Sequence, residues 1–163
     1  MASRSWYQGD GIGLVDDKGR VAIPAALRAS LQANSPKADG KSGGTVIVGP
    51  HQKNRCLIAY DPAWLDIMVA KLEKRETENT GDGGEPDYNI KRAAGLGESV
   101  PFDGSGRFIM PAWPRHYAAI GAQALFVGVL DYIEIWDPQA LIDSDYPPQA
   151  KQMAEFYLNR GAK

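Results

Sequence analysis

Two acidic–basic pairs recur along the chain with the same spacing. Asp16 precedes Arg20 by four positions, Asp103 precedes Arg107 by four positions, and each arginine directly follows a glycine. An Asp at the start of a tight turn can accept hydrogen bonds from the backbone amides after it, and a Gly can supply the positive φ that closes the turn. An arginine held beside such a turn could bridge guanine O6 and N7 in a DNA major groove or grip a phosphate.

The pairs belong to an internal duplication of the chain. Residues 16–24 return as residues 103–111 at an offset of 87 (103 − 16), and residues 60–65 match residues 136–141 at an offset of 76 (136 − 60). The smaller second offset indicates 11 additional residues (87 − 76) in the first copy, and the loop-like run 33–44 is the best candidate for them. A β-turn-β-α-β-β unit of about 45 residues barely closes a core alone, which is a physical reason for joining two.

The bulk composition indicates a globular protein of 163 residues with a net charge of −2. Because the charge is weakly acidic, nucleic-acid binding would have to use local basic patches, multiplied by oligomerisation. No apolar run approaches the roughly 20 residues that span a bilayer, and the N-terminus lacks the apolar core of a signal peptide. The single cysteine, Cys56, lies in an apolar run, so we expect a buried structural thiol in a reducing cytoplasm.

Enzymatic chemistry has little support in the sequence. His51 and His116 have no cysteine or carboxylate at metal-ligand spacing, so we expect no metal site and two ordinary surface or half-buried histidines. No P-loop or dinucleotide-binding fingerprint is present. A triad assembled in space stays open, although no residue nominates one, and we expect neither a cofactor nor a small-molecule substrate.

Hydrophobic periodicity and turn residues predict an α+β protein rich in strands. The expected strands cover residues 7–15, 20–23, 45–48, 55–60, a segment ending at 102, 107–110, 124–130 and 132–136. The expected helices cover residues 25–31, 63–76, 88–96, segments beginning at 111 and 138, and 147–160, with a linker at 77–87. The core of the second helix is predicted to comprise Trp64, Ile67, Met68 and Leu72. In the last helix, Met153, Phe156 and Tyr157 share a face that either packs back or meets a neighbouring subunit.

These residues resemble the MraZ family of bacterial transcriptional regulators, encoded at the start of the division and cell-wall gene cluster. The resemblance rests on the aromatic-x-Gly at Tyr7 and Gly9, the two Asp-x-x-x-Arg turns, Pro24 and the strand end at Trp136-Asp137. It covers roughly residues 7–141. A single such turn would be weak evidence, but two at this separation, with matching strand–helix junctions downstream, are specific.

The resemblance implies both a fold and a function. The implied fold is two tandem SpoVT-AbrB-type swapped-hairpin repeats that form one double-psi-like barrel with peripheral helices. In this chain, 7–63 would be the first repeat, 64–97 a connecting helix and linker, 98–145 the second repeat, and 146–163 a C-terminal helical tail. The implied function is sequence-specific binding of repeated double-stranded promoter boxes by a ring-shaped homo-oligomer in the cytoplasm and nucleoid, usually in repression.

Carried over by position, the DNA-facing residues are Asp16 with Arg20 and Asp103 with Arg107. Lys18, at the tip of the first turn, suits a phosphate contact, which positions the protein without specifying sequence. Two other interpretations stay open. The Asp–Arg pairs could be structural ion pairs that only stabilise hairpins, or the arginines could contact a protein partner, as in an antitoxin or scaffold of the same fold.

Further basic residues lie near the two turns. Arg28 and Arg115 occupy equivalent positions in the two short helices, where they either extend the basic surface or solvate the last helical turn. Lys53 and Arg55 have no basic counterpart in the second copy, so we expect them to be solvated surface residues.

Overall fold

The computed structural model describes residues 4–35, 43–78 and 88–160, and it confirms the predicted α+β class. The strands are β1 (Asp10–Leu14), β2 (Arg20–Ala22), β3 (Gly44–Pro50), β4 (Leu57–Tyr60), β5 (Glu98–Phe102), β6 (Arg107–Ile109), β7 (Gln123–Gly128) and β8 (Ile133–Trp136). The helices are α1 (Ala25–Asn34), α2 (Pro62–Glu78), α3 (Tyr88–Gly95), α4 (Ala112–Tyr117), α5 (Pro138–Ile142) and α6 (Pro148–Arg160). None of the described helices is long and apolar enough to cross a membrane.

The main sheet is antiparallel and has the strand order β1-β7-β8-β4-β3-β5. If β1 to β4 of the first copy are exchanged with β5 to β8 of the second, the same order is read in reverse. The duplication in the sequence therefore returns as an approximate twofold symmetry of the sheet. Each copy also pairs its first strand with the other copy, since β1 joins β7 and β5 joins β3.

Strands β2 and β6 form a separate two-stranded antiparallel sheet, which we call the ribbon. Its register pairs Arg20 with Ile109, Val21 with Phe108, and Ala22 with Arg107. Two more backbone bonds of 2.9 Å, from the amide of Ile23 to Gly106 and from that of Met110 to Gly19, extend it at both ends. The ribbon thus joins the two copies through equivalent turns.

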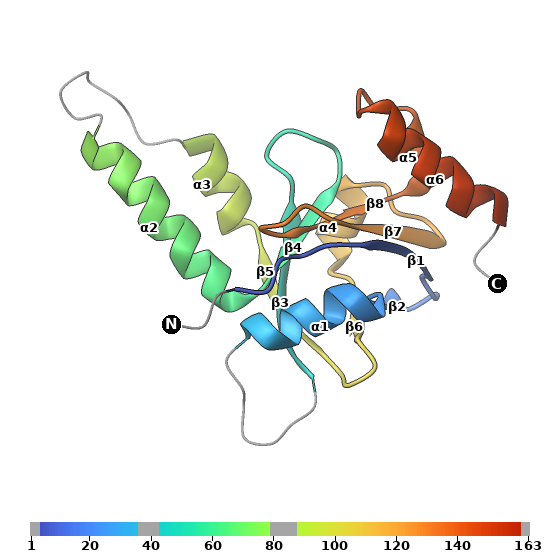
Figure 1. The fold of residues 1–163 in the computed structure, drawn as a ribbon, viewed down its shortest axis with the longest axis horizontal. Helices are drawn as coiled ribbons and strands as arrows, with labels where there is room; N and C mark the ends of the chain where they lie inside the picture. The colour runs from blue at the N-terminus through green and yellow to red at the C-terminus, as the bar shows by residue number, and fades with distance from the viewer. Residues whose placement is uncertain (1–3, 36–42, 79–87, 161–163) are drawn as a thin grey trace.

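The core lies between the ribbon and the main sheet. Val21 and Phe108 are 2% and 3% exposed and point into it, and Phe108 packs edge-to-face on Phe126 with ring centroids 6.5 Å apart. Two helix pairs flank the sheet: α2 and α3 lie at one end in Figure 1 and α5 and α6 at the other. Trp64 of α2 and Tyr157 of α6 pack against residues of the sheet.

Most of the predicted elements form, with shifted ends. The helix predicted over 63–76 is α2, and Trp64, Ile67, Met68 and Leu72 are buried or half-buried as predicted. The first strand is shorter than predicted, because only Asp10–Leu14 pairs continuously with β7. Most of the predicted linker and of the 33–44 loop lies outside the described residues. In α6, Met153 and Tyr157 pack back on the chain, whereas Phe156 stays half-exposed.

Candidate nucleic-acid interface

Asp16 organises the first turn with both of its carboxylate oxygens. Oδ1 accepts the backbone amides of Lys18 and Arg20 at 2.9 and 2.8 Å, and Oδ2 accepts Nε–H of Arg20 at 2.6 Å. Gly19 follows with φ of +83°, in the left-handed region that a side chain strains. The turn therefore has the predicted build: one carboxylate braces the backbone and holds the arginine.

Asp103 repeats this arrangement in the second turn. Its Oδ1 accepts the amides of Ser105 and Arg107, both at 2.9 Å, and its Oδ2 accepts Nε–H of Arg107 at 3.0 Å. Gly106 has φ of +81°. The two turns are thus alike in geometry, but serine in the second stands where lysine stands in the first, so only the first turn carries a cation at its tip.

The hydrogen bonds to each carboxylate lower its pKa. At Asp16 the largest cause is the guanidinium of Arg20, and at Asp103 it is the backbone amide of Arg107. The same ion pair raises the pKa of Arg20 above its ordinary value. Both carboxylates are therefore ionised at neutral pH, and each holds the Nε–H of its arginine.

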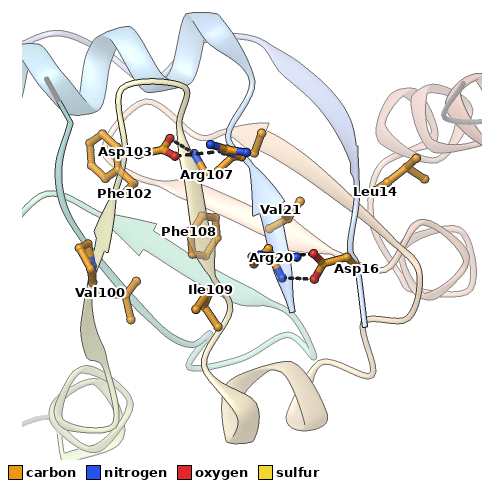
Figure 2. Close-up of a pocket in the computed structure, with 12 residues that line it drawn as sticks. Leu14, Asp16, Arg20, Val21, Val100, Phe102, Asp103, Arg107, Phe108 and Ile109 are labelled. Carbon is orange, nitrogen blue, oxygen red and sulfur yellow. Dashed lines mark hydrogen bonds and ion pairs between the residues drawn. The ribbon is translucent and has the colours of Figure 1, made fainter. Parts of the chain in front are cut away.

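The ribbon presents both arginines on one face, which we call the ribbon face. Side chains alternate along a strand, so Arg20 and Ala22 of β2 point outward together with Arg107 and Ile109 of β6, while the residues between them point inward. The side chains of Arg20 and Arg107 are 54% and 67% exposed. Figure 2 shows them near opposite ends of the ribbon, each turned to its own aspartate.

A shallow depression of about 820 Å³ follows the ribbon face. The Asp16–Arg20 and Asp103–Arg107 pairs line it together with apolar residues of β1 and β5. Leu14 of β1 is 59% exposed there (Figure 2). The face therefore offers two Asp–Arg ion pairs together with exposed apolar carbon, and the sequence motifs indicated only the ion pairs.

Arg28 and Arg115 lie beside the turns, and both donate hydrogen bonds to backbone carbonyls. Nη1 of Arg28 donates to the carbonyl of Ser105, so the helix of the first copy braces the turn of the second. Arg115 donates from Nε to the carbonyl of Ile120 and from Nη2 to that of Gly121, both at 3.0 Å. The guanidinium charge of both residues is thus near the face, but its hydrogen bonds serve the backbone of the protein.

A cluster around one buried carboxylate was not predicted from the sequence. Glu134 is 1% exposed; its Oε1 accepts Nε1–H of Trp136 at 2.8 Å and the hydroxyl of Tyr146, and its Oε2 faces Nε2 of His51 at 3.5 Å. Nδ1 of His51 accepts the amides of Lys53 and Asn54, so Nε2 carries the proton of the neutral ring. This cluster lies on the outer side of the sheet and ties the C-terminal helices to it.

The remaining predicted residues lie away from the ribbon face. Cys56 is buried as predicted, and burial raises the pKa of its thiol. His116 is exposed, and no group of three or more His, Cys, Asp or Glu residues is close enough to hold a metal within the described ranges. Arg55 is exposed as predicted, and its Nε donates to the carbonyl of Tyr117 at 2.9 Å.

Comparison with known proteins identifies the family to which the chain belongs. Residues 97–143 match the family described as "MraZ protein, putative antitoxin-like". The transcriptional regulator MraZ of Shewanella oneidensis is 32% identical over 127 residues, which are 77% of this chain and 76% of that protein. The protein of the same name from Rhodospirillum rubrum is 33% identical over 130 residues, which are 78% of this chain and 76% of that protein. The chain therefore belongs to the MraZ family of transcriptional regulators.

Proposed function

We propose that this protein regulates transcription by binding double-stranded promoter DNA in a sequence-specific way through the ribbon face. The regulated genes would be those of the division and cell-wall cluster, and the effect would be repression. Asp16, Arg20, Asp103 and Arg107 are the proposed contact residues, with Lys18 on a phosphate and with Arg28 and Arg115 adding positive charge beside the turns. The site of action would be the nucleoid in the cytoplasm.

One observation carries the proposal. Arg20 and Arg107 extend from a single outward face, and of each guanidinium the aspartate accepts only Nε–H. Within the described part of the chain, neither arginine has a hydrogen-bond partner for its two terminal nitrogens, so both forks stay open. A two-stranded ribbon fits the major groove, where an arginine fork pairs with O6 and N7 of guanine.

The weak acidic charge of the chain makes assembly part of the proposal. A single ribbon offers few cations, so tight binding would come from a ring-shaped homo-oligomer that places several ribbons on spaced promoter boxes. Trp6 and Trp113, each at least half exposed, offer apolar surface that such an assembly could cover. The palindromic strand order and the exchanged first strands support the finer assignment of a swapped-hairpin barrel built from tandem repeats.

The test compares binding to the DNA upstream of the protein's own gene with binding to an unrelated duplex of the same length. We expect Arg20→Ala and Arg107→Ala each to weaken binding to the upstream DNA about ten- to a hundredfold, because each removes a bidentate base contact. Arg75→Ala removes an exposed cation from α2 and serves as the control. Thermal unfolding of all variants should stay close to that of the parent protein, and a parallel loss of folding would instead support purely structural ion pairs.

A protein partner remains the second candidate, and the apolar depression favours it. In that case the ribbon face would bind a protein, as in an antitoxin or scaffold. Salt separates the two candidates, because DNA binding releases counterions and weakens steeply between 50 and 200 mM salt. Affinity for the upstream DNA that is weak and equal to that for unrelated DNA would favour the protein partner.

A further inference from the structure

The two ends of the ribbon are equivalent in fold but differ in the residue beside each arginine. The offset of 87 that relates Arg20 to Arg107 also relates Ala22 to Ile109. Because the strands run antiparallel, Arg20 stands opposite Ile109 and Arg107 stands opposite Ala22. One arginine therefore has a branched apolar neighbour, whereas the other has a single methyl group.

Ile109 is a large apolar side chain in an unusual place. It is 59% exposed on the ribbon face and lies at the Arg20 end of the ribbon, at the opposite end of β6 from Arg107 (Figure 2). The side chain before it, Phe108, already fills the core position, so folding does not require an isoleucine at 109. A phosphate backbone offers no apolar partner to such a side chain. In the major groove, however, the C5-methyl group of thymine is an apolar group at the base edge.

We propose that Ile109 reads the C5-methyl group of a thymine close to the base that Arg20 contacts. The inference rests on the proposed function, because it needs the ribbon face in the major groove. Opposite residues of an antiparallel pair have Cβ atoms about 5 Å apart, and neighbouring bases of one strand are about 3.4 Å apart. Ile109 thus reaches a base within about two steps of the Arg20 contact.

At the other end, Ala22 offers only one methyl group beside Arg107. Its short side chain reaches less far from the ribbon than Ile109 does. The two ends of the ribbon therefore differ in base preference, and only the Arg20 end selects thymine. The tips of the two turns differ as well, because Lys18 in the first turn stands where Ser105 stands in the second. The charge of Lys18 strengthens the phosphate contact of the first turn, which is also the turn at the Arg20 end.

The experiment is a double-mutant cycle, in which the C5-methyl groups are removed from the DNA and the Ile109 side chain is removed from the protein. The duplex from upstream of the protein's own gene is prepared with thymine or with uracil throughout, and binding to each is measured by fluorescence anisotropy at fixed salt. We expect the parent protein to bind the uracil duplex about fourfold more weakly for each methyl group contacted. Ile109→Ala should bind both duplexes alike, since the contact is already lost.

Two further variants act as controls. Ile109→Val keeps a branched side chain and should retain most of the preference for thymine. Leu96→Ala removes an equally exposed apolar side chain outside the ribbon and should show the full parental loss with uracil, which accounts for any change in duplex shape. Thermal unfolding of Ile109→Ala is measured to check that the variant is folded.

The outcomes separate the two proposals. Equal binding of both duplexes by the parent protein, or an unchanged uracil effect in Ile109→Ala, would overturn the role of Ile109 and leave DNA binding through the arginines intact. Absence of specific binding by the parent protein to either duplex would overturn both.

Discussion

The turn glycines allow a test of the ribbon's construction that does not depend on DNA. Gly19 and Gly106 have nearly the same φ, +83° and +81°, so replacing either with alanine imposes the same backbone strain. Their surroundings differ. A Cβ on Gly19 would meet its nearest atom, the carbonyl oxygen of Met110, at 3.5 Å, whereas a Cβ on Gly106 would lie 2.8 Å from Cδ of Arg28 and 3.0 Å from the carbonyl oxygen of Ile23.

The expected free energies of unfolding follow from these contacts. Left-handed backbone costs alanine about 1–2 kcal/mol, and the reduced entropy of the unfolded chain returns about 0.4–1 kcal/mol. Gly19→Ala should therefore lose roughly 0.5–1 kcal/mol. Gly106→Ala must also displace Arg28 from the carbonyl of Ser105, a hydrogen bond worth about 1 kcal/mol, so its loss should be about 2 kcal/mol.

Urea denaturation of the two variants measures this difference. Gly95→Ala is the control, because a Cβ there meets nothing within 4 Å and the position ends helix α3, so we expect stabilisation by about 0.5–1 kcal/mol. Equal losses at the two turns, or a larger loss at Gly19, would show that the contact between Arg28 and the second turn is not part of the fold's stability.

Two more predictions concern buried polar groups. Asp61 accepts hydrogen bonds from Arg4, from the hydroxyl of Tyr7 and from the amide of Trp64, so Asp61→Asn should lower the free energy of unfolding by about 1–3 kcal/mol in urea denaturation. Asp137→Asn, at the equivalent helix start, should cost less than about 1 kcal/mol, and a reversed order would contradict the assignment. Burial holds the pKa of His51 below its ordinary 6.5 although Glu134 opposes this, so only the unfolded chain gains a proton just below that pH. Stability should therefore fall on acidification below about pH 6.5, by at most about 1.4 kcal/mol per pH unit, and His51→Gln should lack this loss in urea denaturation from pH 7.5 to 5.

Local chemistry explains which parts of the structure could be predicted. The two turns depend on an aspartate and a glycine a few positions apart, so the hydrogen bonds of Asp16 and Asp103 follow from the sequence alone. The exposure of Ile109 could also have been predicted, since strand alternation puts it on the same face as Arg107. A role for it could not be predicted, because a single isoleucine in a strand forms no recognisable motif.

The features that could not be predicted depend on contacts between residues far apart in the sequence. The strand order joins β1 to β7 across more than 100 residues, and no local pattern in the sequence specifies that partner. Glu134 has the pattern of an outward, solvated strand residue, yet it is buried because Tyr146, from the segment after α5, covers it. Arg28 likewise looks like a surface cation until the turn of the other copy is placed beside it.

The claim that both arginines of one ribbon face contact promoter DNA is tested most directly with the double variant Arg20→Ala/Arg107→Ala. Its affinity for the DNA upstream of its own gene is measured by fluorescence anisotropy from 50 to 200 mM salt, beside an unrelated duplex. The account predicts that the variant remains folded and binds both duplexes with the weak affinity that the parent protein shows for unrelated DNA. A folded double variant that still prefers the upstream DNA as strongly as the parent protein would contradict the account.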